Sequence, residues 1–121
     1  LNIGDEEVYG VETELEQVFI NLITNSRDAF VENNIKNREI QITSIKKENH
    51  TIIIVQDNAG GIKNNDIDEI FNPYFTTKKD GTGTGLYMVQ LVTKVSFNGD
   101  LKVQNSKTGL KFIISLPKKT P

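Results

Sequence analysis

The stretch Thr51-Ile52-Ile53-Ile54-Val55-Gln56-Asp57-Asn58-Ala59-Gly60-Gly61 decides the fold. Its first five residues are all β-branched, which is typical of a well-buried strand. The strand ends at a carboxylate, and the small residues after it leave the backbone open to the approach of a flat ligand. A carboxylate in such a place can accept a hydrogen bond from an exocyclic amine such as that of adenine. Taken alone, however, the segment is better explained as an Asx turn, which is common.

The residues before this strand predict a helix followed by a hairpin. Ile40, Ile42 and Ile45 alternate as in a half-buried strand, and the polar segment 46–50 predicts a tight turn between the two strands. Further upstream, Thr13 and Glu16 form a capping box that predicts the start of a helix. The polar cluster 32–34 predicts its end. The apolar stripe of this helix consists of Leu15, Val18, Phe19, Leu22, Ile23, Ala29 and Phe30.

The residues after the strand predict a long loop, a second helix and a closing hairpin. The loop over 57–85 holds most of the glycine, and a long loop inside a compact domain is usually functional or mobile. Apolar residues at helical spacing predict a helix from about Thr84 to Ser96. A turn at 98–100 follows, and then two strands, 101–103 and 112–116, meet around Thr108-Gly109. Strands and helices in separate blocks indicate an α+β fold with a mostly antiparallel sheet.

Composition excludes several classes of protein. The 121 residues suffice for one domain with one core, and the formal net charge of −2 gives no electrostatic reason to expect nucleic acid or an anionic membrane as a partner. Without cysteine there is no disulfide frame or thiolate site. No apolar run approaches the roughly 20 residues that span a bilayer. Since residues 1–5 resemble no signal peptide and there is no initiator Met, we expect 1–121 to be a single domain of a longer protein.

Asn21, Asn25 and Asp28 share one face of the first predicted helix, because residues three and four apart are neighbours on a helix. Carboxamide oxygens suit a hard cation such as Mg²⁺, which keeps several waters and takes further oxygens from substrate phosphates. The same residues fit the solvated outer side of a helix equally well.

Gly81-Thr82-Gly83-Thr84-Gly85-Leu86 precedes the second predicted helix. Glycine-rich backbone at a helix N-terminus exposes amide donors at the positive end of the dipole, which favours phosphate. The segment is not a Walker loop, because no Gly-Lys-Ser or Gly-Lys-Thr follows, and it does not follow a strand as a dinucleotide fingerprint does.

Phe71-Asn72-Pro73-Tyr74-Phe75-Thr76-Thr77-Lys78 places three aromatic rings on the predicted loop. Exposed rings on a loop usually anchor something, but we expect at least one of these to pack beneath the loop. Lys78 and Lys79 adjoin the glycines and can meet phosphate charge.

In order and spacing, four of these segments resemble the four boxes of histidine kinase catalytic domains. Residues 21–29 resemble the asparagine box and residues 57–62 the first glycine box. Residues 71–78 resemble the phenylalanine box and residues 81–88 the second glycine box. The resemblance runs from about Val8 to Pro117 and extends to the superfamily of DNA gyrase, the mismatch-repair ATPases and the ATP-dependent heat-shock chaperones. The residues Phe-Asn-Pro-Tyr-Phe-Thr-Thr-Lys at 71–78, and the Asp-Ala at 28–29 that closes the asparagine box, resemble the nitrogen-regulation-like branch of these kinases.

The resemblance implies a fold and a ligand. The fold would be a two-layer α/β sandwich of the Bergerat type, with a mixed, mostly antiparallel sheet of about five strands and about three helices. ATP would lie between the first helix and a lid over about 71–84. Asn25 would bind Mg²⁺, Asp57 would accept from the adenine amine, and Gly61 would let the base approach.

The resemblance also implies roles around the phosphates. Gly83 and Gly85 would bring the lid backbone to the phosphates, Lys78 would contact the γ-phosphate, and Phe75 would govern lid position and docking to a partner helix. The residues implied in ATP binding are Asn25, Asp28, Asp57, Gly61, Ile62, Phe75, Thr76, Thr77, Lys78, Gly81, Thr82, Gly83, Thr84, Gly85 and Leu86. Those implied in catalysis are Asn21, Asn25 and Lys78.

Three positions depart from the family pattern. Many members carry a basic residue where Asp28 stands, and Ala59 occupies a position that is often glycine. Members often show Gly-Thr-x-Phe near the last hairpin, whereas residues 109–112 read Gly-Leu-Lys-Phe. The third departure predicts the loss of a hydroxyl partner near the adenine site.

Asn21 separates two functions within the superfamily. In the gyrase, mismatch-repair and chaperone branches the matching position carries a glutamate that activates water. An amide cannot act as that base, so a hydrolytic ATPase is disfavoured. An anti-sigma-type or degenerate nucleotide-binding module remains the alternative to a kinase.

His50 is the sole histidine and falls in a predicted turn, so we expect it to be an ordinary surface residue. By the resemblance, the reactive histidine lies on a separate dimerising helical domain before Leu1. The chain is therefore expected to bind ATP and Mg²⁺ in a two-component system without phosphorylating itself. Its partners would be that helical domain and a downstream response regulator. This domain would be cytoplasmic, whether or not the whole protein is anchored in a membrane.

Overall fold

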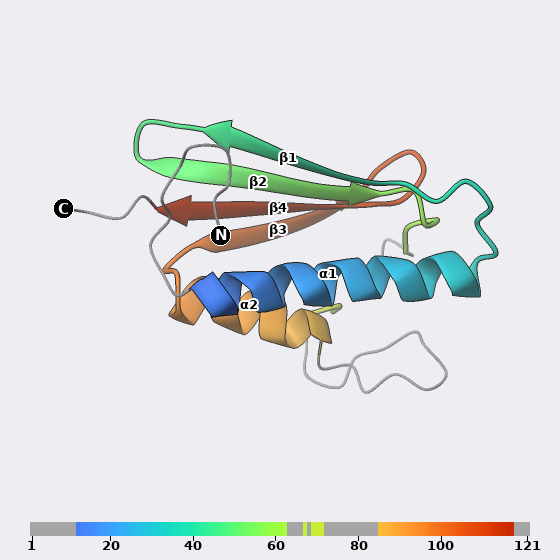
Figure 1. The fold of residues 1–121 in the computed structure, drawn as a ribbon, viewed down its shortest axis with the longest axis horizontal. Coiled ribbons are helices and arrows are strands. Elements are labelled where there is room, and N and C mark those ends of the chain that lie inside the picture. Colours follow the sequence, from blue (N-terminus) through green and yellow to red (C-terminus); the bar gives the residue numbers. More distant parts are fainter. Residues whose placement is uncertain (1–11, 63–66, 68, 72–84, 118–121) are drawn as a thin grey trace.

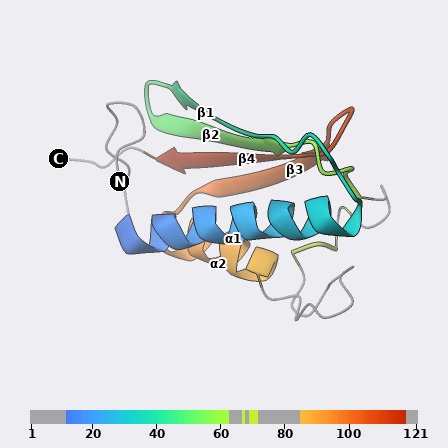
Figure 2. The same ribbon diagram turned by 45° about the vertical axis from the view of Figure 1, so that its right-hand side comes forward.

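The computed structural model describes residues 12–62, 67, 69–71 and 85–117, which form two layers (Figure 1). A four-stranded sheet forms one layer, and two helices lie side by side against one of its faces, as the turned view also shows (Figure 2). The elements in chain order are α1 (Glu12–Glu32), β1 (Ile40–Lys46), β2 (His50–Asp57), α2 (Gly85–Val95), β3 (Asp100–Asn105) and β4 (Leu110–Pro117). The predicted α+β sandwich is confirmed. Its described part has four strands, all paired antiparallel, and two helices, where about five and three were expected.

Strand β2 lies in the interior of the sheet, as its β-branched run predicted. The strand order is β1-β2-β4-β3, and the β1–β2 turn closes with a hydrogen bond from the Lys47 N–H to the His50 carbonyl at 2.9 Å. Alternate residues of β2 from Thr51 to Asp57 are buried. That alternation directs Asp57 to the same side as the apolar core, at the end of the strand.

The core fills the space between the sheet and the helices. The residues of this cluster are Leu15, Val18, Leu22, Ile53, Val55, Ile70, Val89, Phe97, Leu101, Leu110, Phe112, Ile114 and Leu116. Each fully buried side chain of this kind contributes about 1.5–3 kcal/mol relative to an exposed one. The stripe predicted for the first helix supplies Leu15, Val18 and Leu22 to this cluster, which fixes the rotation of α1 about its axis.

Helix α1 ends where the sequence predicted but begins earlier. It starts at Glu12, so Thr13 lies within the first turn and is not the cap. After its end, Asn34 takes a left-handed conformation (φ 53°), and the Ile35 N–H donates to the Phe30 carbonyl at 3.0 Å. This is the six-to-one bond of a Schellman motif, in which Asn is tolerated at the left-handed position.

Helix α2 is also followed by a left-handed asparagine, but its closing hydrogen bond spans six residues and not five. Asn98 has φ 53°, and the Gly99 N–H donates to the Thr93 carbonyl at 2.9 Å. A Cβ atom on Gly99 would lie 2.4 Å from the Ser115 carbonyl oxygen of β4, so glycine is needed for the chain to enter β3 here. The predicted turn at 98–100 is thereby explained. Within the described residues, neither helix has the length and apolar character that would let it cross a membrane.

Candidate functional site

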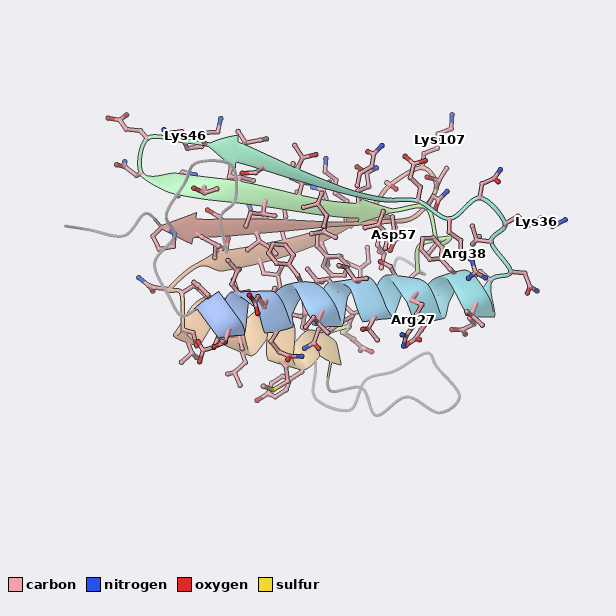
Figure 3. The ribbon with its side chains drawn as sticks, in the orientation of Figure 1. Arg27, Lys36, Arg38, Lys46, Asp57 and Lys107 are labelled. Carbon is pink, nitrogen blue, oxygen red and sulfur yellow. The ribbon has the colours of Figure 1, made fainter. Side chains whose placement is uncertain are left out.

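The Asp57 carboxylate lies between the sheet and α1 at the end of β2 (Figure 3). Its residue is 5% exposed. Oδ1 accepts hydrogen bonds from the backbone N–H groups of Ala59 and Leu110, both at 3.1 Å, and Oδ2 accepts from the Ser26 hydroxyl at 2.5 Å. One donor from the turn after Asp57 and two from distant segments thus hold the carboxylate, which is what a buried charge requires.

The Asx turn considered as the alternative is also present. The bond from the Ala59 N–H to Asp57 Oδ1 is the Asx-type bond to a backbone group two residues on. The Asx turn does not exclude an acceptor for an exocyclic amine, because the turn uses Oδ1 and leaves Oδ2 for other donors, of which Ser26 is one.

The glycines after Asp57 adopt backbone conformations that side chains disfavour. Gly60 has φ 104° and Gly61 has φ 70°. A Cβ atom on Gly61 would lie 2.7 Å from Asn105 Oδ1, and one on Gly60 would lie 3.0 Å from Asn33 Nδ2. Both glycines are therefore favoured by their backbone angle, and Gly61 also by the lack of space beside Asn105.

Two asparagine side chains that the sequence did not single out hold this glycine segment. Asn33 Nδ2 donates to the Ala59 carbonyl at 2.6 Å. The Asn105 carboxamide accepts from the Ile62 N–H at 3.0 Å and donates to the Ile62 carbonyl at 2.8 Å. After β2 ends at Asp57, the backbone no longer pairs with a neighbouring strand, and these side-chain bonds take the place of that pairing. They hold the segment against the ends of α1 and β3.

Gly109, predicted only as part of a turn, has no room for a side chain. A Cβ atom there would lie 2.1 Å from the Asp57 carbonyl oxygen and 2.5 Å from its Oδ1. The turn itself is closed by bonds between Ser106 and Gly109 in both directions, at 2.7 and 3.0 Å. The tight approach is what brings the Leu110 N–H to the carboxylate. No local pattern in the sequence signals it, because it depends on the pairing of β2 with β4.

The hydroxyl expected to be lost at Leu110 is supplied from elsewhere. Leu110 still donates its backbone N–H to Asp57, and Ser26 on α1, 1% exposed, provides a hydroxyl to the same carboxylate. Ser26 follows Asn25 directly, and nothing in the spacing of the helix distinguishes it from a core position. The departure at Leu110 therefore does not leave Asp57 without a hydroxyl partner.

Asn21 links the two helices. Its Oδ1 accepts from Gln17 Nε2 at 2.8 Å, and its Nδ2 donates to the Gly85 carbonyl at 3.3 Å. Gly85 begins α2, and a Cβ atom there would meet nothing within 4 Å. Leu86, also predicted to bind the ligand, is half-buried and packs against the core.

Asn25 and Asp28 are both half-buried on α1. Among the described residues no hydrogen-bond partner is found for the Asn25 carboxamide, whereas Asp28 pairs with the neighbouring Arg27 at 3.6 Å. Such a partly exposed pair contributes little to stability. No group of three or more His, Cys, Asp or Glu side chains within the described ranges is placed to hold a metal ion.

The other predicted ligand contacts fall on residues that are not described. Phe75, Thr76, Thr77, Lys78, Gly81, Thr82, Gly83 and Thr84 lie outside the described residues. Of the aromatic segment, Phe71 is described, and its ring packs edge-to-face on Phe112 with centroids 6.3 Å apart. The expectation that at least one ring of this segment is part of the packing is confirmed.

A cavity of about 510 Å³ opens at the same end of the sheet. Its lining includes Gln41 and Gln56, which are register partners across β1 and β2. The alternation of β2 directs Gln56 to the face away from the helices, whereas the Asp57 side chain points toward them. Asp57 also lines this cavity, so the cavity reaches the end of β2, where Gln56 and Asp57 direct their side chains to opposite faces of the sheet.

His50 begins β2, at the opposite end of that strand from Asp57. Figure 3 shows this separation, because Lys46, the last residue of β1, lies at one end of the sheet and Asp57 lies toward the other. His50 is half-buried and belongs to no helix.

Three comparisons with known proteins agree with this geometry. The profile of the family described as histidine kinase-, DNA gyrase B- and HSP90-like ATPase matches residues 10–120. The two-component sensor PprA of Pseudomonas aeruginosa is 36% identical over 118 residues, covering 94% of this chain and 13% of the relative. Sporulation kinase C of Bacillus subtilis is 32% identical, covering 93% and 26%. The sensor histidine kinase ZraS of Salmonella typhi is 40% identical over 107 residues, covering 85% and 22%. The chain thus spans roughly an eighth to a quarter of the length of these relatives.

Solved structures show the same fold. The catalytic domain of the histidine kinase ThkA, in a nucleotide-free form, superimposes with a TM-score of 0.78 at 30% identity, covering 92% of this chain and 71% of that one. The mycobacterial sensor histidine kinase MprB, at 19% identity, gives a TM-score of 0.77 and supports the fold alone.

Proposed function

This chain belongs to the family of histidine kinase-, DNA gyrase B- and HSP90-like ATPases, with sensor histidine kinases among its relatives, and on that premise we propose that it binds Mg·ATP as a kinase catalytic domain. It would donate the γ-phosphoryl group to a histidine on a separate helical domain of a two-component sensor. A downstream response regulator would then be phosphorylated from that histidine.

The fixed carboxylate of Asp57 carries the proposal. A buried carboxylate with its own protein donors in place is preorganised to accept an N–H from adenine, because no side chain has to move when the base arrives. Gly61 lies four residues on, in a segment that Asn105 holds rigid. A flat base can therefore lie against backbone that carries no side chain.

The Asn25 carboxamide is the candidate ligand for Mg²⁺. Asn25 is half-buried on the helix that also carries Ser26, and no described residue forms a hydrogen bond with its carboxamide. Mg²⁺ typically takes one or two protein oxygens and completes its shell with water and phosphate. Bound there, the ion would neutralise phosphate charge during transfer, and the chain's own residues would bind and orient the nucleotide.

The amide side chain of Asn21 favours transfer to a histidine over hydrolysis of ATP. Its carboxamide is engaged by Gln17 and Gly85, and an amide cannot take a proton from water near neutral pH. A neutral imidazole needs no such base, because it is already nucleophilic. We do not assign this imidazole to His50, because His50 belongs to no helix and lies at the opposite end of β2 from the proposed adenine site.

Calorimetry with a non-hydrolysable ATP analogue tests the proposal. We expect binding that strengthens with Mg²⁺, and an Asp57→Asn variant that binds about tenfold to a hundredfold more weakly, because it loses a hydrogen bond to a charged group. Gln56→Ala is the control, since Gln56 adjoins Asp57 but points to the other face of the sheet. Thermal unfolding of each variant separates loss of binding from loss of fold.

The outcomes distinguish the kinase from its alternative. Binding by the parent chain and by Gln56→Ala, with loss in Asp57→Asn, supports the nucleotide pocket. Phosphate transfer to an added helical domain bearing a histidine, with none onto the chain alone, then supports the kinase. A folded parent chain that binds no nucleotide with or without Mg²⁺ would favour a degenerate scaffold.

A further inference from the structure

Ser26 makes a contact that is unusual for a hydroxyl inside a helix. A helical Ser or Thr commonly bonds the carbonyl four residues back, and Thr93 of α2 does so, to the Val89 carbonyl at 2.7 Å. Ser26 instead donates to Asp57 Oδ2, 31 residues away, at 2.5 Å. That distance is at the short end for a hydroxyl bonded to a carboxylate, which is a charge-assisted bond.

The count of donors around Asp57 leaves one place vacant. A carboxylate offers about four lone-pair positions, two on each oxygen. Oδ1 uses both, for the N–H groups of Ala59 and Leu110, and Oδ2 uses one, for Ser26. No described residue donates to the remaining acceptor position, on Oδ2, and the Ser26 bond fixes the direction of that position because it restrains rotation of the carboxylate.

We propose that Ser26 is a positioning residue that sets the base specificity of the site, an inference that rests on the proposed binding of ATP. By occupying one position of Oδ2, its hydroxyl aims the single vacant lone pair at one N–H of the 6-amino group of adenine. Guanine presents an oxygen there, so two acceptors would face each other without a donor. A site built to bond a polar group rejects ligands that cannot complete the bond.

Ser26 takes this role because Leu110 cannot. The Leu110 side chain has no hydroxyl and is part of the apolar core, so the last hairpin contributes only its backbone N–H. Besides Ser26, the hydrogen bonds that the described residues make to Asp57 are backbone N–H bonds to Oδ1. Without Ser26 the Oδ2 atom would have two vacant positions, and the carboxylate would lose the bond that orients it.

The test compares ligands that differ only in the 6-amino group. Non-hydrolysable triphosphates of adenosine and of purine riboside, which lacks the amine, are titrated against the parent chain, Ser26→Ala and Ser26→Thr. We expect the parent chain to prefer the adenosine compound by about tenfold or more. In Ser26→Ala this preference should shrink by about tenfold, through weaker binding of the adenosine compound. Ser26→Thr, which keeps the hydroxyl, should restore it.

Thr93→Val is the matched control, because it removes a buried helical hydroxyl that bonds only its own helix. It should lower the unfolding temperature and leave the ligand preference unchanged. The preference is a ratio measured on one sample, so it does not depend on the folded fraction. If Ser26→Ala does not fold, Ser26→Cys gives the same comparison with a weaker donor of similar size.

An unchanged preference in Ser26→Ala would overturn the inference and leave the proposed function standing. A parent chain that binds both triphosphates equally would also overturn it, because the amine would then not be read. A parent chain that binds neither would overturn the proposed function and the inference together.

Discussion

Two regions of this molecule, which we propose hold opposite ends of the same nucleotide, are built differently. At the carboxylate corner, formed by 57–62 and 105–110, the hydrogen bonds to Asp57 and Ile62 are made within the protein, and a side chain at Gly109 would overlap its neighbours. The helix junction is the place where Asn21 and Asn25 of α1 lie near the start of α2 at Gly85. There Gly85 has open space around it, and no described residue forms a hydrogen bond with the Asn25 carboxamide.

The difference teaches where the protein is preorganised and where the ligand must contribute. The corner is complete before the base arrives, so adenine recognition would cost little reorganisation. The junction offers amide oxygen and helix N-terminal backbone, which suit Mg²⁺ and phosphate, and its bonds to these ligands would add to the existing bond between Asn21 and Gly85. Variants at the two regions should therefore separate stability from binding.

Gly109→Ala should have the largest effect on stability. A Cβ atom 2.1 Å from the Asp57 carbonyl would force β2 and β4 apart at their ends, because both backbones are fixed by the sheet. We expect the free energy of unfolding to fall by about 3 kcal/mol or more, and nucleotide binding to fall with it. Urea unfolding followed by circular dichroism gives the first value. A change of less than about 0.5 kcal/mol, the size of an ordinary surface substitution, would mean that the corner is loose.

Asn105→Ala should have an intermediate effect. It removes both bonds to Ile62 and leaves the N–H and carbonyl of that residue without their protein partner, which costs about 1–3 kcal/mol. Asn105→Asp is the matched variant, since it keeps an acceptor for the N–H but loses the donor. We expect Asp to rank between Asn and Ala in unfolding free energy. Equal stability of all three would show that the glycine segment needs no clamp.

Gly85→Ala should have the smallest effect on stability, and it should stabilise the fold where the other two substitutions destabilise it. The added Cβ meets open space at the start of α2, and alanine favours a helix by up to about 1 kcal/mol over glycine. The unfolding temperature should stay level or rise, while affinity for the ATP analogue falls if backbone at this position approaches the phosphates. Unchanged affinity would remove Gly85 from the binding site and sharpen the contrast with Gly109.

The parts of the fold that local patterns encode were predictable. The β-branched run 51–55 identified an interior strand, and the stripe through Leu22 identified the core face of α1. Asn34 and Asn98 end both helices close to where polar clusters predicted an end. The capping box at Thr13 did not mark the start of α1, because Glu12 already lies in the helix.

The candidate site was predictable only in part, because much of its structure depends on pairing between distant segments. Asp57 and Gly61 stood out through their local motif. Ser26, Asn105 and Gly109 did not, since their roles arise from the packing of α1 on β2 and the register of β2 with β4. A serine in a helix and a glycine in a hairpin have ordinary explanations, and only the folded chain shows that they meet at one carboxylate.

The three donors to Asp57 come from residues 26, 59 and 110, which are separated by up to 53 positions from the residue they hold. Contacts of such long range form late, because the chain between them must first be closed into a loop. A nascent chain leaving the ribosome would therefore carry no complete corner until its final strand had emerged. Nucleotide affinity acquired during synthesis would then report that β4 had joined the sheet, since no piece that ends before residue 110 contains the assembled carboxylate.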